Sequence, residues 1–163
     1  MSREVRKVPA SWQHPKDGFY PNGQVRYVPL HDGFMRRAAK WDEEAAKWAK
    51  GEFPAYADDE SKAGTYESWD GSRPDPAEYM PDWPESERTH FMMYETTSEG
   101  TPVSPAFATQ EELAQWMTDN GSTFGGSNAS YDQWLRVCKG SSTPTMVIGP
   151  NGLQSGVQAL NND

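Results

Sequence analysis

The sequence predicts an α+β fold: a small antiparallel sheet with two to three helices, plus an irregular N-terminal half rich in aromatic residues and proline. Two capping boxes, Thr109–Glu112 and Ser130–Gln133, each precede a run with apolar residues at helical spacing. Short apolar runs at Thr89–Thr96, Thr145–Ile148 and Leu153–Val157 predict strands, and the last two predict a hairpin.

A longer helix is expected over Gly33–Lys50, with Asp32 as its N-cap and Gly51 as its C-cap. One face carries residues at 4-3-4-3 spacing, namely Phe34, Ala38, Trp41, Ala45 and Trp48. We interpret it as a docking helix whose tryptophans enter the core; the alternative is a seam for partner binding or dimerisation. Before this helix, proline and the Asn22-Gly23 turn indicate irregular backbone, with Val25–Leu30 as one short edge strand.

Charge is distributed unevenly along the chain, which has 163 residues and a formal net charge of −9. Residues 52–87 hold eleven Asp and Glu against two Lys and Arg, whereas residues 1–51 are net basic. A net negative charge disfavours direct binding to nucleic acid or to a membrane surface, and it favours a partner with a basic surface. No apolar run is long enough for a membrane span and no signal peptide is evident, so we expect a cytoplasmic protein.

Three segments follow from these patterns, within one structural domain overall. Residues 1–51 form an irregular segment and an amphipathic helix, and residues 88–163 form a compact α+β core. Residues 52–87 combine acids and prolines with six aromatic residues, whereas disordered linkers carry few rings. We therefore expect this stretch to be an ordered, acidic, extended wrap over the globular part.

The segment His90–Phe107 holds the candidate site, because ordinary packing does not require so many hydroxyls and carboxylates between two apolar ends. The candidates for catalysis are His90, Glu95, Ser98 and Glu99. Glu99 would act as a general base or bind a polar group, and His90 would be a base oriented by Glu95 or Glu99. The competing interpretation is a polar turn in which Gly100 supplies a positive φ.

No metal or cofactor is expected from the sequence. The three histidines lie far apart and show no metal-ligand spacing with one another or with the single cysteine. That cysteine, Cys138, lies in an amphipathic stretch and is expected to be a small buried hydrophobe. The glycine-rich loop Gly121–Gly126 lacks the pattern of a phosphate-binding loop.

Three motifs stand out together: Glu67–Pro74 with Tyr79–Pro84, then Met93–Phe107 leading into Glu111–Trp116, and last Leu153–Val157. This combination resembles a group of small proteins encoded by tailed bacteriophages and prophages. The resemblance covers most of the chain, and its central motif, YETTSEGTPVSPAF, is specific to that group. No activity is established for the group, so no functional residue is carried over. The resemblance implies a non-structural phage protein that acts inside a bacterial cell.

Charge and this context predict a phage accessory protein that binds a bacterial host protein and inhibits or modulates it, such as an anti-CRISPR-like inhibitor of a defence system. Carboxylates and aromatic anchors would occupy a basic groove built for nucleic acid. The predicted partner-binding residues are Asp58, Asp59, Glu60, Trp69, Asp70, Tyr79, Asp82 and Trp83.

Two alternatives stay open at this point. One is a small enzyme or ligand-binding domain with its site at His90, Glu95, Ser98, Glu99 and Ser104. The other is a virion-associated structural protein. Homo-oligomerisation is compatible with all three hypotheses.

Overall fold

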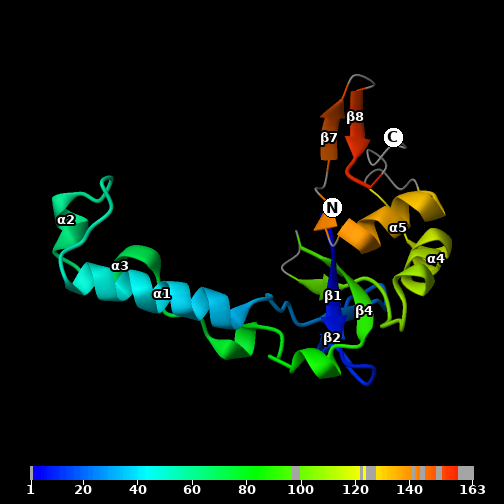
Figure 1. Ribbon diagram of the computed structural model, residues 1–163, viewed down its shortest axis with the longest axis horizontal. Coiled ribbons are helices and arrows are strands. Elements are labelled where there is room, and N and C mark those ends of the chain that lie inside the picture. The colour runs from blue at the N-terminus through cyan, green and yellow to red at the C-terminus, as the bar shows by residue number, and fades with distance from the viewer. Residues whose placement is uncertain are drawn as a thin grey trace. The chain divides into compact units, whose positions relative to one another are not determined.

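The computed structural model describes residues 2–96, 100–121, 123, 128–140, 142–143, 146–149 and 152–157. It confirms the α+β class. The chain forms two compact units (Figure 1): unit 1 comprises Met1–Leu30 and Trp83–Asp163, and unit 2 comprises His31–Asp82. These units do not coincide with the three segments expected from the sequence, because unit 1 draws on both ends of the chain.

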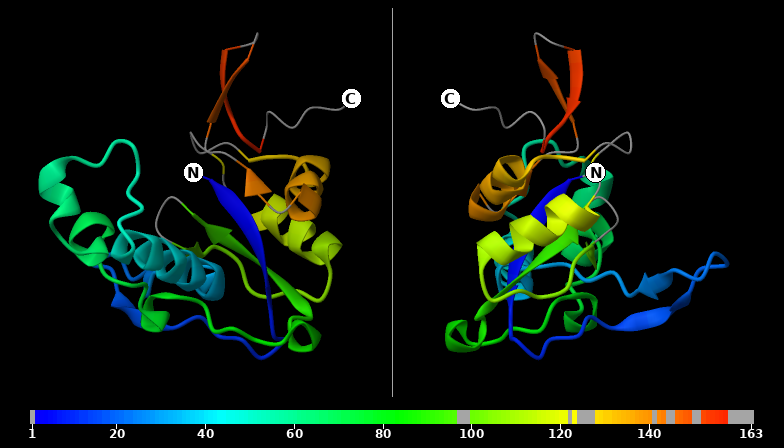
Figure 2. Two further views of the ribbon diagram at one scale, coloured as in Figure 1. Left: turned by 60° about the vertical axis from the view of Figure 1, so that its left-hand side comes forward. Right: turned by 90° about the vertical axis from the view of Figure 1, so that its right-hand side faces the viewer.

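Unit 1 is built on a four-stranded sheet in the order β5-β4-β1-β6. Its two long strands, β1 (Arg3–Val8) and β4 (His90–Glu95), pair antiparallel along their full length (Figure 2). The short strand β5 (Thr101–Pro102) flanks β4, and β6 (Ser142–Thr143) flanks β1. The segment proposed to carry the site therefore lies beside the first residues of the chain.

The strand β1 corrects the prediction that the first thirty residues are irregular. Its sequence, REVRKV, carries four charged residues in six positions, which is unusual for an inner strand. Arg3 and Arg6 are nevertheless buried, and each forms an ion pair, with Glu95 and Glu4 respectively. Charged residues become buried when they are paired. The Glu95 partner comes from a distant part of the chain, so local alternation could not reveal this strand.

Two helices, α4 (Gln110–Asn120) and α5 (Tyr131–Gly140), cover one face of this sheet (Figure 2). Both predicted capping boxes are confirmed, at Thr109 with Glu112 and at Ser130 with Gln133. The buried apolar cluster of unit 1 consists of Met93, Leu113, Ala114, Met117, Ala129, Trp134, Val137, Cys138 and Val157. Burial raises the pKa of the Cys138 thiol to about 12. The thiol is therefore protonated at neutral pH, as a core residue rather than a nucleophile.

An N-terminal ribbon joins β2 (Lys16–Phe19) to β3 (Val25–Tyr27) around the predicted Asn22-Gly23 turn. The backbone N–H of Tyr20 donates to the carbonyl of Gln24 at 2.8 Å and closes this turn. The edge strand expected over residues 25–30 therefore covers only the residues of β3, and it pairs with β2, which was not predicted.

A second ribbon forms the predicted C-terminal hairpin, from β7 (Met146–Gly149) and β8 (Gly152–Ser155). Its side chains at Met146, Val147 and Ile148 are exposed. A single 3-10 turn, η2 (Glu85–Glu87), precedes β4.

Unit 2 consists of the helix α1 (Phe34–Ala49) and a returning chain that packs on it. The returning chain forms α2 (Asp59–Lys62), α3 (Tyr66–Asp70) and the 3-10 turn η1 (Pro76–Glu78). The stretch predicted to be an extended wrap is therefore ordered, but it contains short helices, and in unit 2 it packs on α1. This packing is possible because α1 offers a row of aromatic side chains.

Both caps of α1 lie one residue away from the predicted positions. Gly33, with φ of 76°, is the N-cap, and the Asp32 carboxylate accepts only from the N–H of Gly33. The expectation that Asp32 caps the helix is therefore wrong by one residue. The C-cap is Lys50, so the expectation that Gly51 caps the helix is also wrong by one residue. Gly51 follows the cap with φ of 80° and donates to the carbonyl of Trp48.

The aromatic face of α1 is covered by the chain that follows it. The Trp48 ring is buried, and its centroid lies 4.8 Å from that of Phe53 and 5.5 Å from that of Trp69. The Trp48 indole N–H donates to the carbonyl of Gly64 at 3.0 Å. The docking interpretation is confirmed within unit 2, and this part of the face is not available as a dimer seam.

Gly100 provides a test of the packing around the end of β4. Its φ is 88°, and a Cβ added to it would lie 1.9 Å from the carbonyl oxygen of Leu30. We predict that Gly100→Ala lowers the free energy of unfolding by about 3 kcal/mol, from clash and backbone strain together. Gly23→Ala should cost about 1 kcal/mol, because Gly23 also has a positive φ but has no atom within 4 Å of an added Cβ. Chemical denaturation measures both, and equal losses would contradict the clash.

Candidate functional site

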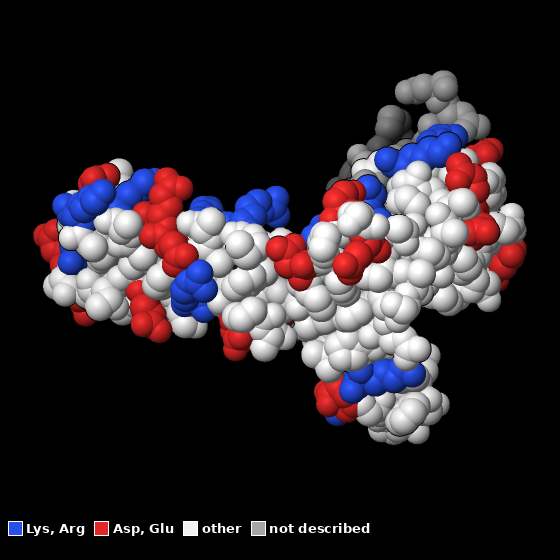
Figure 3. Space-filling model, turned by 60° about the horizontal axis from the view of Figure 1, so that its bottom comes forward, with Lys and Arg blue, Asp and Glu red and all other residues white. Residues whose placement is uncertain are grey.

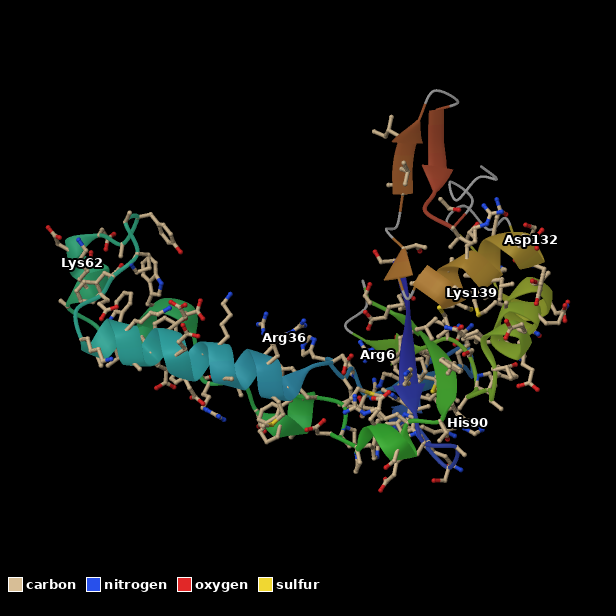
Figure 4. The ribbon with its side chains drawn as sticks, viewed as in Figure 1. Arg6, Arg36, Lys62, His90, Asp132 and Lys139 are labelled. Carbon is tan, nitrogen blue, oxygen red and sulfur yellow. The ribbon has the colours of Figure 1, made fainter. Side chains whose placement is uncertain are left out.

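The strand β4 separates the residues that the sequence placed in one catalytic site. His90 opens the strand opposite Val8, and Glu95 ends it opposite Arg3. At about 3.4 Å per residue, their α-carbons lie roughly 17 Å apart. His90 lies at the N-terminal end of β4 (Figure 4), where its Nδ1 is 2.9 Å from the hydroxyl oxygen of Thr89. Glu95 therefore does not orient His90, and that part of the expectation is wrong. Glu99, the other residue expected to orient His90, lies outside the described residues.

Glu95 serves a structural role in a buried ion pair. Its carboxylate oxygen Oε2 lies 3.3 Å from Nη1 of Arg3, and both side chains are almost fully buried. Burial lowers the pKa of the Arg3 guanidinium, and the Glu95 carboxylate opposes this shift. Each charge makes the burial of the other tolerable.

The hydroxyl of Ser104 is also occupied by the fold. It accepts from the backbone N–H of Met93 at 2.9 Å and donates to the carbonyl of Pro105 at 2.8 Å. Ser98 and Glu99 lie outside the described residues, whereas Gly100 has the positive φ expected of it. The described members of the predicted site therefore do not converge on a catalytic arrangement.

Tyr94, between these residues, is the centre of a buried network that the sequence did not reveal. Its side chain is fully buried, and its hydroxyl oxygen lies 3.1 Å from Nε1 of Trp12 and 3.1 Å from Nδ1 of His14. The guanidinium carbon of Arg6 lies 4.4 Å from the centre of the Tyr94 ring, a cation–π geometry. Arg6 also donates to the carbonyl of Leu30 at 2.7 Å.

The protonation of His14 follows from its two partners. Nε2 lies 2.6 Å from the carbonyl oxygen of Val28, which can only accept, so Nε2 carries a proton. Burial lowers the pKa of His14; the hydrogen bond to Val28 opposes this shift and the charge of Arg6 adds to it. The imidazole is therefore neutral at pH 7, and its Nδ1 can accept the proton of the Tyr94 hydroxyl. With both nitrogens engaged, His14 is held as a structural group.

A groove of about 610 Å³ opens beside this network, entirely within unit 1. Its size lies in the range of sites for small molecules. The lining residues that matter here are Trp12, His14, Lys16, Tyr27, Ser104 and Trp116. The segment Pro102–Ala106 forms part of one wall, so the groove borders the stretch that the sequence singled out. The other wall comes from residues 10–27, where proline-flanked aromatic residues were the only available signal.

Seven of the eight predicted partner-binding residues lie in unit 2, and Trp83 lies in unit 1. Two of the predicted aromatic anchors are used internally. Tyr79 is buried against Phe34, with ring centroids 5.4 Å apart. Trp83 is half-buried and contacts Trp12 edge to face at 4.7 Å. These two rings stabilise the fold and are not free anchors.

The other predicted members are more accessible. Asp58 caps α2 and accepts from the backbone N–H of Ser61. Hydrogen bonding with the side chain of Ser61, and then with its backbone N–H, lowers the pKa of Asp58. Trp69 belongs to α3 and is half-buried, with its ring against Trp48 of α1. Asp70 accepts from the hydroxyl of Tyr66 at 3.1 Å, and Asp82 is exposed.

Tyr56 is a surface aromatic residue that sequence reasoning missed. Its side chain is 81 % exposed, and its ring centroid lies 5.9 Å from that of Trp69. After the buried Ala57, the chain continues with exposed carboxylates at Asp58, Asp59 and Glu60. We call Tyr56 and these three acids, with Trp69, the acidic patch. The available signal for Tyr56 was its position in a short turn between Pro54 and the run of acids from Asp58.

Comparison of the chain with models of protein families, with curated proteins and with solved structures finds no match. Within the described ranges, no helix has the length and apolar character needed to cross a membrane. The same residues contain no group of three or more His, Cys, Asp or Glu side chains placed to hold a metal ion. The function must therefore be argued from the groove and the acidic patch.

The Arg3–Glu95 pair predicts a specific pattern of stabilities. Glu95→Ala should lower the free energy of unfolding by about 3–5 kcal/mol, because it leaves the Arg3 charge buried without its carboxylate. The double variant Arg3→Met/Glu95→Leu should recover most of this loss, since it removes both charges. Urea denaturation of the single and double variants measures the difference. Additive losses in the double variant would contradict the pairing.

The environment of His14 predicts a pH dependence of stability. Because the folded-state pKa is lowered, the unfolded chain binds a proton first as the pH falls. Stability is therefore complete above the unfolded pKa of about 6.5 and decreases below it, by at most about 1.4 kcal/mol per pH unit. Denaturation midpoints between about pH 7.5 and 5.5 avoid the carboxylate range. The decrease should be smaller in His14→Gln. An NMR titration that places the His14 pKa at or above about 6.5 would contradict this assignment.

Proposed function

We propose that the protein binds a basic protein partner through the acidic patch of unit 2, and that this partner is a bacterial host protein which it inhibits or modulates. The observation that carries the proposal is Tyr56, a highly exposed ring beside three exposed carboxylates on a fixed aromatic scaffold. Large rings at the centre of a polar surface are typical of residues that dominate binding energy. The resemblance to phage proteins supports a site of action in the cytoplasm of a bacterial host.

The charge of unit 2 supports a basic partner. The unit has thirteen Asp and Glu against seven Lys and Arg. Acidic and basic side chains are interspersed on its surface (Figure 3). Several of the basic ones are already paired within the unit: Lys47 with Glu43 at 2.8 Å, Lys62 with Asp59 at 3.1 Å and Arg73 with Asp42 at 2.8 Å. The remaining field is negative, and it would steer a basic groove toward this unit.

The scaffold beneath the acidic patch is suited to hold a binding surface. Trp69 stacks on the buried Trp48, and Tyr56 rests against the Trp69 ring. The N-cap bonds of Asp58 and Thr65 fix the starts of α2 and α3. A ring that is already ordered loses less conformational entropy on binding than a mobile one. This arrangement favours a binding protein over an enzyme, for which the described residues offer no converging catalytic groups.

Binding by the acidic patch predicts a defined response to substitution. The triple variant Tyr56→Ser/Asp59→Asn/Glu60→Gln should weaken binding to the partner by about tenfold or more, because it removes the ring and two charges. The partner is first captured from bacterial lysate with the tagged protein at low salt, then purified for titration calorimetry. High ionic strength should weaken wild-type binding, since exposed charges are screened.

The matched control is Tyr20→Ser/Glu87→Gln/Asp132→Asn, which removes the same three residue types from exposed positions of unit 1. Binding should change less than about twofold in this control. A partner that binds both triple variants equally, or that is indifferent to salt, would refute the proposal.

A further inference from the structure

The groove of unit 1 has two walls of different origin. One wall is the segment that follows β5, with Trp116 of α4 beside it. The other includes Trp12 and one face of the β2–β3 ribbon, where Lys16 lies directly opposite Tyr27 in the antiparallel register. Side chains directly opposite each other share a face of the ribbon. The groove is therefore bounded by three aromatic side chains and one ammonium group.

The ribbon also carries an ion pair next to Lys16. Successive side chains of a strand alternate between faces, so Arg26 points away from the face of β3 that carries Tyr27. The register of β2 shifts between Lys16 and Gly18, so Asp17 is placed by its partner rather than by alternation. Asp17 and Arg26 pair with each other, Nε of Arg26 lying 3.2 Å from the Asp17 carboxylate. The nearest acid to Lys16 in sequence is thus paired with Arg26, and it is not among the residues that line the groove.

Among the described residues that line the groove, Lys16 is the only charged one. Within the described part of the chain, its ammonium group forms no ion pair and no hydrogen bond. His14 is neutral, with both nitrogens engaged, and the Ser104 hydroxyl is engaged as well. The groove therefore presents aromatic surface and a single positive charge, with no carboxylate to repel an anion.

We propose that this groove binds a small planar aromatic compound that carries an anionic group, a carboxylate or a phosphate. The ring would lie against Trp12, Tyr27 and Trp116, and the anion would meet the ammonium group of Lys16. A volume of about 610 Å³ accommodates a molecule of this class. The site lies in unit 1 and does not depend on the acidic patch, so either proposal can fail without the other.

The test uses three probes that share one ring and differ in charge: 2-naphthoate, 2-naphthamide and 2-naphthylmethylamine. Binding is followed through the indole N–H resonances of Trp12 and Trp116 in the full-length protein at low ionic strength. The carboxylate should bind most tightly and the amine most weakly. The carboxylate should exceed the amide by about fivefold, the value of one exposed charge pair.

Two variants and one control separate charge from ring contacts. Lys16→Gln should make the carboxylate and the amide bind equally, whereas Trp116→Leu should weaken all three probes. Lys139→Gln is the control, because Lys139 is an exposed lysine on α5 that is not among the residues lining the groove. It removes one positive charge elsewhere and should leave the order of affinities unchanged. Dispersed backbone resonances in each variant establish that it is folded.

Three outcomes would overturn the proposal. One is the absence of indole shifts with 2-naphthoate at about 1 mM, the weak limit for specific binding. Another is equal binding of the three probes to the wild-type protein. The third is an equal effect of Lys16→Gln and Lys139→Gln, which would show a general charge effect rather than a site.

Discussion

The structure of unit 1 depends on the fully buried Tyr94, because both its hydroxyl and its ring find their partners inside the protein. Its hydroxyl engages Trp12 and His14, and its ring lies under the guanidinium of Arg6. A buried hydroxyl without a partner would cost about 1–3 kcal/mol, so these contacts hold the N-terminal thirty residues to the sheet. The groove results from the contacts of Tyr94, because Trp12 and His14, which these contacts hold in place, line it.

The sequence predicted well those elements whose signals are local. The capping boxes at Thr109 and Ser130 place the required hydroxyl and carboxylate or amide within four residues, so they specify where α4 and α5 begin. The aromatic spacing of α1 is equally local. Its N-cap was misplaced because Asp32 is a preferred capping residue, and the left-handed conformation of Gly33 cannot be read from composition.

The sequence failed where a residue depends on a distant partner. Arg3 and Arg6 resemble solvent-exposed residues until Glu95 and Tyr94 are brought beside them, and this requires the pairing of β1 with β4. The groove was missed for the same reason, since its walls are separated by about eighty residues of sequence. Glu95 was chosen as a catalytic candidate because a carboxylate at a strand end suggests chemistry, and only its ion pair reveals a structural role.

The division of the chain has a consequence for how the protein folds during synthesis. The strand β1 leaves the ribosome before its partner β4, and the whole of unit 2 lies between them in the sequence. Unit 2 is contiguous, and its ends meet through the hydrogen bonds between His31, Glu78 and Met80, so it can form in the interval. A waiting strand is a hazard for aggregation, and the four charges of β1 oppose it. The residues that hid this strand from prediction are thus of the kind that discourages pairing with another chain.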